Sequence, residues 1–138
     1  MNKIVAVLIL LPTLIYGIVP WFADWNHTHL FHPQWPPHAR FHMMWLLCVN
    51  SSIAAYALLL FSQNRRTETA TIGLLVFGAF WIATLSQNFY GGALGDPNGG
   101  YEAIAGIDLN AFTFGICTLL LITGLVLDLR RSKPLQQL

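Results

Sequence analysis

Residues 24–42 read DWNHTHLFHPQWPPHARFH, and this stretch separates the first long apolar run of the chain from the second. It contains all five histidines and three of the seven prolines of the chain. The sequence on either side is apolar and nearly free of charge. This distribution predicts a scaffold of apolar segments that carries one polar site, and places that site in the histidine stretch, residues 24–42.

The composition predicts a membrane protein. The chain has 138 residues, of which 55% are hydrophobic and 9% are charged, whereas a soluble domain usually carries about 25% charged residues. Its length suits a single domain, residues 1–138. A net charge of +1 gives no indication of a nucleic-acid partner. Cys48 and Cys117 lie in apolar runs and form neither a disulfide framework nor a CxxC metal site.

Four apolar runs are long enough to cross a bilayer, which takes about 20 residues as a helix. They cover about residues 4–22, 38–62, 70–90 and 109–129. The first run is long for a signal peptide and no small-x-small cleavage site follows it, so we expect a retained helix. The fold class expected is therefore all-α, an integral membrane four-helix bundle with a histidine-rich loop between its first two helices.

Local signals predict where these helices begin and end. Pro36-Pro37 is expected to start the second helix, because proline is tolerated in a first turn. Thr67 or Thr69 is expected to cap the third helix, and Asp108 to cap the fourth. Gly91-Gly92 is expected to end the third helix and to open a polar, glycine-rich loop.

The basic residues predict the orientation of the bundle. One side receives six of them: Lys3, Arg65, Arg66, Arg130, Arg131 and Lys133. Only Arg40 falls on the other side. The positive-inside rule then predicts cytoplasmic termini (N-in/C-in), with the histidine stretch and the 91–108 loop outside. We expect a bacterial inner-membrane protein whose site faces the periplasm.

Polar residues from all four helices are expected to meet at the outer end of the bundle. They are Asp24 after the first helix, His38 and His42 on the second, Gln87 and Asn88 on the third, and Asp108 and Asn110 on the fourth. Such residues usually face a bundle interior or a wet cavity. Asn50 lies about two turns below His42, where it can form the floor of this pocket or hydrogen-bond between helices. The sequence predicts a polar pocket open to the outside.

The histidines suggest metal binding. His38 and His42 are four residues apart, so a helix presents both on one face, and two imidazoles at this spacing can hold one metal ion. The preceding loop can supply further ligands: Asp24, His27, His29 and His32. Imidazole suits zinc, iron and copper, so the element stays open. The alternative is that the histidines and tryptophans anchor the loop at headgroup level.

The same residues can act as an acid–base site without metal. Histidine titrates near neutral pH, and a carboxylate beside it can orient the ring. Asp24 and Asp108 are the carboxylates best placed for this, with Asn88 at the same depth; Asp108 can instead serve only as a helix cap. Arg40 can bind an anionic lipid-like ligand, reach to headgroups, or pair with Asp24.

The pattern THxxxPxWPPHARFH, Thr28 to His42, resembles the signature of a family of small bacterial four-helix membrane proteins that has no established activity. More loosely, the architecture is similar to the sterol-isomerase-like (emopamil-binding) membrane fold. That resemblance implies a lipophilic cavity in which histidine and carboxylates move protons on sterols. None of that family's catalytic residues can be aligned with positions of this chain.

Three functions follow as hypotheses. The first is a membrane enzyme, isomerase- or hydrolase-like, that acts on a lipophilic small molecule through Asp24, His38 and His42. The second is an extracytoplasmic metal-binding or accessory protein, in which the loop histidines matter as much as the helical pair. The third is a structural subunit of a membrane complex. A homo-oligomer is compatible with each of them.

Overall fold

A computed structural model describes residues 3–95 and 103–132. It contains four helices, α1 (Lys3–Ala23), α2 (Pro37–Ser62), α3 (Arg66–Tyr90) and α4 (Leu109–Ser132), and a two-stranded hairpin, β1 (Ala103–Ile104) and β2 (Ile107–Asp108). All four helices are long and apolar enough to cross a membrane. The expected all-α, four-helix integral membrane fold is therefore confirmed.

Most helix ends follow the expected signals. Pro36 precedes α2 and Pro37 is its first residue, while Gly91 ends α3 in the left-handed conformation at φ 70°. The side chain of Asp108 accepts hydrogen bonds from the backbone N–H groups of Asn110 (2.9 Å) and Ala111 (3.2 Å). These groups have no partner within the helix, so Asp108 caps α4 as expected.

The predicted threonine cap of α3 is wrong. The helix begins at Arg66, with Arg65 at its N-cap position, so Thr67 and Thr69 lie inside it. The Thr69 hydroxyl donates to the carbonyl oxygens of Arg65 (2.9 Å) and Ala57 (3.2 Å) and thereby ties α3 to α2. The error arose because the first turn, Arg66-Thr67-Glu68-Thr69, is too polar to count as part of an apolar run.

The small hairpin is a feature that the sequence did not reveal. β1 and β2 pair antiparallel around Ala105 and Gly106, whose φ angles are 52° and 79°. Two consecutive left-handed residues are typical of a tight hairpin turn. The usual Asn-Gly or Asp-Gly signal is replaced here by Ala-Gly, which does not stand out from the surrounding loop.

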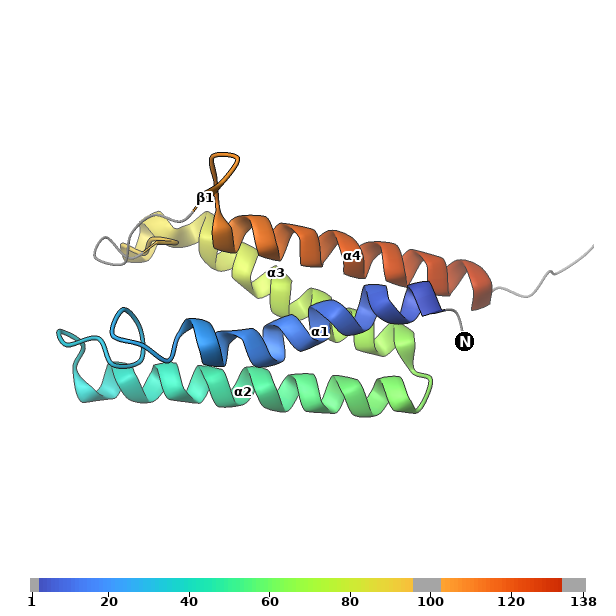
Figure 1. The fold of residues 1–138 in the computed structure, drawn as a ribbon, viewed down its shortest axis with the longest axis horizontal. Helices are drawn as coiled ribbons and strands as arrows, with labels where there is room; N and C mark the ends of the chain where they lie inside the picture. The colour runs from blue at the N-terminus through green and yellow to red at the C-terminus, as the bar shows by residue number, and fades with distance from the viewer. Residues whose placement is uncertain (1–2, 96–102, 133–138) are drawn as a thin grey trace, which may run out of the picture.

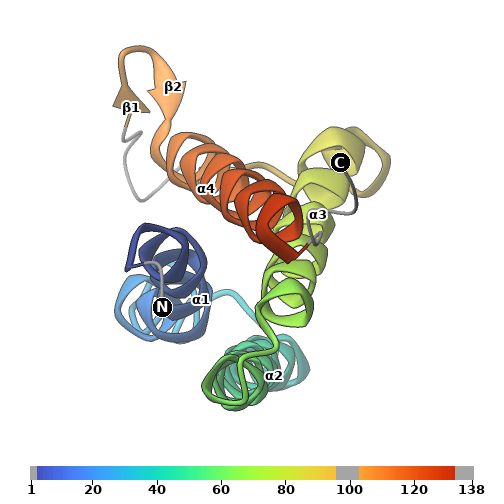
Figure 2. The same ribbon diagram turned by 90° about the vertical axis from the view of Figure 1, so that its right-hand side faces the viewer.

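The four helices run lengthwise with their ends grouped in two places (Figure 1). The start of α1, the α2–α3 connection and the end of α4 lie together, and we call this the basic end. The end of α1, the loop 24–36, the start of α2 and the end of α3 lie at the opposite end, the histidine end. Viewed along the bundle, α2 and α3 meet at the basic end and separate toward the histidine end (Figure 2).

The core brings together residues from all four helices. It consists of Val5, Ile9, Tyr16, Ala54, Ala70, Phe77, Cys117 and Leu121, all fully or almost fully buried. The rings of Tyr16 and Phe77 meet edge to face with centroids 5.9 Å apart, and Phe77 meets Phe114 in the same way at 5.1 Å. Aromatic pairs prefer this geometry, so Phe77 holds three helices in register.

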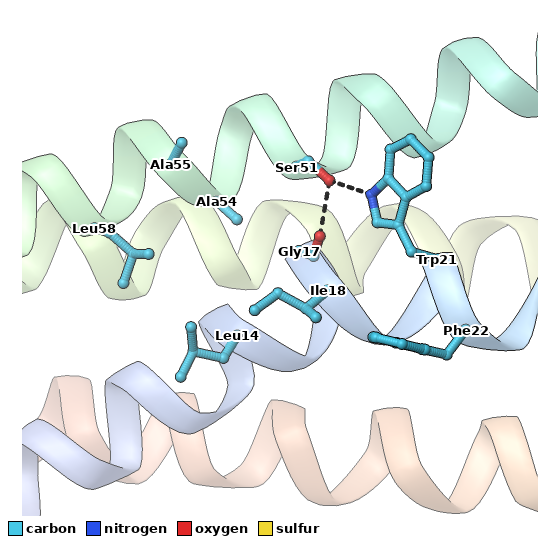
Figure 3. Close-up of a pocket in the computed structure, with 9 residues that line it drawn as sticks. All are labelled: Leu14, Gly17, Ile18, Trp21, Phe22, Ser51, Ala54, Ala55 and Leu58. Atoms are coloured by element: carbon cyan, nitrogen blue, oxygen red, sulfur yellow. Dashed lines mark hydrogen bonds between the residues drawn. The ribbon is translucent and has the colours of Figure 1, made fainter.

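α1 and α2 approach closely at a small-residue contact. A Cβ added at Gly17 would overlap the Cβ of Ala54, so the side chain of Ala54 packs directly against the backbone of α1 at Gly17. The Ser51 hydroxyl donates to the Gly17 carbonyl oxygen (2.8 Å) and accepts from the Trp21 indole N–H (2.6 Å) (Figure 3). Small residues and interhelical hydrogen bonds are the usual means of helix association in membranes.

A charged contact ties α3 to α4 at the basic end. Arg66 Nη1 lies 3.8 Å from Asp128 Oδ1, and the Thr67 hydroxyl donates to Asp128 Oδ2 at 3.3 Å. Both charged side chains are less than one fifth exposed. Another ion pair, Arg65 with Glu68, is about half exposed and lies within one turn.

We expect Asp128→Asn to lower the unfolding temperature of the detergent-purified protein more than Glu68→Gln does. Removing one partner of a shielded pair leaves an uncompensated charge at Arg66, which costs about 1 kcal/mol or more. An exposed pair contributes little, because water screens it. Thermal unfolding of the two variants, followed by circular dichroism, checks this; equal unfolding temperatures would contradict it.

Candidate functional site

A cavity of about 540 Å³ lies between the helices toward the histidine end, and we call it the interhelical cavity. Residues from all four helices line it, together with Asp24, which directly follows α1: Pro20, Asp24, Leu46, Leu47, Asn50, Ile53, Leu75, Val76, Ala79, Phe80, Ala83 and Phe114. Only Asp24 and Asn50 in this set carry polar side chains. An apolar cavity of this size with few polar groups is typical of a small-molecule site.

The cavity opens between α2 and α3. Leu47 of α2 is fully buried at its inner wall, whereas Leu46 of α2 and Leu75 of α3 are 52% and 69% exposed. These two exposed leucines form the rim where the helices separate. Both helices are long and apolar enough to cross a membrane, so the opening lies between two candidate membrane-spanning segments.

Asp24 is placed at the cavity by the end of α1. Its backbone N–H donates to the Pro20 carbonyl at 2.8 Å, which continues the helical pattern one residue past Ala23. One carboxyl oxygen, Oδ1, lies 3.7 Å from Nε2 of His29, and the Asp24 side chain is 22% exposed. Burial raises the pKa of Asp24 above its ordinary value, and the charge of a protonated His29 offsets part of that rise.

The loop after α1 fixes the orientation of His29. Asn26 Nδ2 donates to the Ala23 carbonyl (2.7 Å), so Asn26 Oδ1 is an acceptor, and it receives the Thr28 hydroxyl at 2.8 Å. The hydroxyl has one hydrogen, so the Thr28 oxygen accepts from Nδ1–H of His29 at 2.9 Å. His29 therefore presents Nε2, its other ring nitrogen, to the carboxyl of Asp24.

Nε2 of His29 lies 3.7 Å from Oδ1 of Asp24, which is longer than a hydrogen bond. The loop therefore holds the imidazole ring beside the carboxyl group of Asp24, close enough for a charge on either group to act on the other.

Asn50 lines the interhelical cavity, which is mostly apolar and differs from the polar pocket that the sequence predicts below the histidine stretch. Its neighbour Ser51 takes the other role that was open for this segment, the hydrogen bond between helices. The aromatic lining, Phe80 and Phe114, was missed. The centroids of these two rings, one from α3 and one from α4, lie 4.1 Å apart in a stacked arrangement.

His38 and His42 lie on one face of α2, as expected, with Nε2 atoms 3.0 Å apart. They are exposed and do not line the interhelical cavity. His27 packs against Phe31, His32 stacks on Trp35 and His29 lies beside Asp24, so the five histidines are spread over four places. Within residues 3–95 and 103–132, no group of three or more His, Cys, Asp or Glu could hold a metal ion.

The remaining predicted site residues lie away from the cavity. Asn88 is exposed in the last turn of α3. The Asp108 carboxyl caps α4, the structural role already left open for it. The Arg40 guanidinium donates to the carbonyl oxygens of His32 (3.0 Å) and Pro33 (3.4 Å), so it fastens the loop and is not paired with Asp24. Catalytic roles for Asn88 and Asp108 stay predictions.

Four membrane-spanning helices around an apolar cavity with one carboxyl and one amide define a small integral membrane protein with a candidate small-molecule site. The chain belongs to the family of unknown function DUF6640, whose family model matches residues 8–133. Comparison with curated proteins and with solved structures gives no significant match. The looser resemblance to the sterol-isomerase-like fold therefore stays a prediction.

Proposed function

We propose that this protein binds a lipophilic small molecule in the interhelical cavity and moves a proton on it, as an isomerase or hydrolase does. The observation that carries the proposal is the placement of Asp24, with His29 beside it, at the wall of a cavity whose other lining residues are apolar except Asn50. Perturbed carboxyls in clefts are candidates for functional groups. Asp24 is such a carboxyl.

The cavity lining favours a ligand that is apolar along most of its length. Ten of the twelve lining side chains are apolar, and they come from helices that face lipid. The opening between α2 and α3 lets such a ligand enter from the bilayer without crossing water. Asn50 offers amide N–H donors for a ligand oxygen and a carbonyl acceptor for a ligand hydroxyl, which is enough to set which end of the molecule enters first.

The chemistry proposed is proton transfer between two carbons of the ligand. The Asp24 carboxylate removes a proton from the carbon next to a carbonyl, and the electron pair of that C–H bond moves toward the carbonyl oxygen. Asn50 donates a hydrogen bond to this oxygen as it gains charge. Asp24 then returns the proton to a different carbon, and a double bond has shifted. A raised pKa makes Asp24 a stronger base than an ordinary aspartate.

The orientation proposed places this site on the outside. The basic end carries Lys3, Arg65, Arg66, Arg130 and Arg131, and basic residues are concentrated on the cytoplasmic side of membrane proteins. The histidine end then faces the periplasm if the membrane is a bacterial inner membrane. The ligand is accordingly one that resides in the outer leaflet of that membrane.

The test uses β,γ-unsaturated lipophilic ketones of increasing size with the detergent-purified protein in D₂O. We expect the wild type to move the double bond, and to incorporate deuterium at carbon to the extent that the proton on Asp24 exchanges with solvent before it is returned, measured by mass spectrometry. Asp24→Asn, which keeps the shape of the side chain, should lower the rate by about 10²- to 10⁴-fold. Unchanged conversion in Asp24→Asn would rule out the proposed role of this carboxyl.

The rate should also depend on pH in a defined direction. Asp24 acts as a base only when it is deprotonated, so the rate falls as the pH is lowered through the pKa of this group. Burial raises that pKa, so the loss should occur above the ordinary aspartate value of about 3.9. Thr28→Val, which leaves His29 Nδ1 without its partner, should shift this inflection while Asn88→Ala should not.

A further inference from the structure

We propose that His38 and His42 form a surface binding site for one divalent transition-metal ion of the class that prefers imidazole, with Cu²⁺ bound most strongly. The pair lies at the start of α2, outside the interhelical cavity. The site does not depend on the proposed proton transfer, because neither histidine contributes to that cavity.

The geometry of the two rings carries this inference. Their Nε2 atoms are 3.0 Å apart, and the rings stand nearly perpendicular with centroids separated by 4.5 Å. Metal–imidazole bonds are about 2.0–2.1 Å long, so two of them at angles between right and tetrahedral place their nitrogens about 2.9–3.4 Å apart. The observed separation falls in this range. A linear two-coordinate ion would need about 4 Å.

The surroundings leave the remaining coordination positions free. Both histidines are exposed, and their other close ring contacts are Phe41 and Trp45, which offer no metal ligand. A single N–H···N hydrogen bond between two exposed imidazoles competes with water and contributes little. A metal ion binds both nitrogens at once and takes water in its other positions. The expected order of affinity places Cu²⁺ above Ni²⁺ and Zn²⁺.

The helix supplies the rigidity that such a site needs. Pro36 precedes α2, and Pro37 is its first residue, directly before His38. Proline restricts the backbone of a first helical turn. The Arg40 guanidinium, between the two histidines in sequence, is held by the loop carbonyl oxygens of His32 and Pro33. The four-residue spacing is thus kept on a helix that is secured at its beginning.

The experiment is titration of the detergent-purified protein, carrying an affinity tag without histidine, with Cu²⁺ and with Zn²⁺ by calorimetry. Electron paramagnetic resonance of the copper form then counts bound nitrogens. We expect one Cu²⁺ per chain with two imidazole nitrogens. His38→Ala and His42→Ala should each weaken binding by about tenfold or more, because each removes one of two protein ligands. Circular dichroism verifies that the variants remain folded.

His27→Ala is the matched control, since His27 belongs to the same stretch and packs on Phe31 away from the pair. It should bind Cu²⁺ as the wild type does. The proposal would be overturned if the wild type bound no more tightly than the double variant His38→Ala/His42→Ala. It would be overturned equally by a His27→Ala loss as large as that of His38→Ala, which would indicate diffuse binding by the whole loop.

Discussion

Replacing Gly17 by alanine is expected to destabilise the folded protein by about 1–3 kcal/mol, the usual cost of overpacking a tight contact. The added methyl would overlap the Cβ of Ala54, which cannot rotate away as a long side chain can. α1 and α2 must therefore move apart, and the hydrogen bond from Ser51 to the Gly17 carbonyl lengthens with them. Thermal unfolding in detergent measures the loss.

A second substitution should reverse this effect. In Gly17→Ala/Ala54→Gly the methyl group is only transferred from α2 to α1, so the helices can return to their original distance. Gly78→Ala is the control, because a Cβ at Gly78 meets nothing within 4 Å. That variant should unfold at or slightly above the wild-type temperature, since alanine favours helix over glycine. A Gly17→Ala protein as stable as Gly78→Ala would refute the close contact.

Filling the interhelical cavity should abolish ligand binding without unfolding the protein. Ala79→Trp introduces a large side chain from α3 into the space beside Asp24 and Asn50. We expect a photoactivatable diazirine ketone to label the wild type on α2 and α3, in competition with the unlabelled ketone. Labelling of Ala79→Trp should fall by at least about tenfold, because the ligand can no longer bury most of its surface.

The matched control for this experiment is Ile82→Trp, also on α3. Ile82 is 70% exposed and is not among the residues that line the cavity. It adds the same ring to the lipid-facing side of the helix, so labelling should persist. Equal labelling of the wild type, Ala79→Trp and Ile82→Trp would show that the ketone binds elsewhere. Loss in both tryptophan variants would point to a general effect of the substitution on α3.

The fold was predictable from the sequence because apolar length and helix breakers act locally. Each of the four runs needed only its own residues to be identified, and Pro36-Pro37, Gly91 and Asp108 set ends that depend on backbone chemistry at one position. The start of α3 was misjudged for the same reason. Its first turn is polar and is held by tertiary contacts to α2 and α4 that a local pattern does not contain.

The candidate site was predictable only in part. Asp24 and Asn50 were expected at a polar pocket open to the outside, and both line the interhelical cavity, which is instead mostly apolar. Hydropathy does not show that α2 and α3 separate toward the histidine end. The sequence therefore predicted neither the Phe80 and Phe114 lining of the interhelical cavity nor the position of His38 and His42 outside it. The orientation of the His29 ring is set by its hydrogen bond with Thr28, which in turn donates to Asn26. These contacts depend on the path of the loop, which a local sequence pattern does not give.

The separation of α2 from α3 also determines which concentration governs occupancy of the cavity. A molecule that arrives through the acyl chains is in equilibrium with its mole fraction in the bilayer, and partitioning from water precedes binding. Each added methylene group favours the membrane by about 0.8 kcal/mol, which is about a fourfold rise in local concentration. A homologous series of ligands would thus appear to bind ever more tightly when referred to water, and would show constant affinity when referred to lipid.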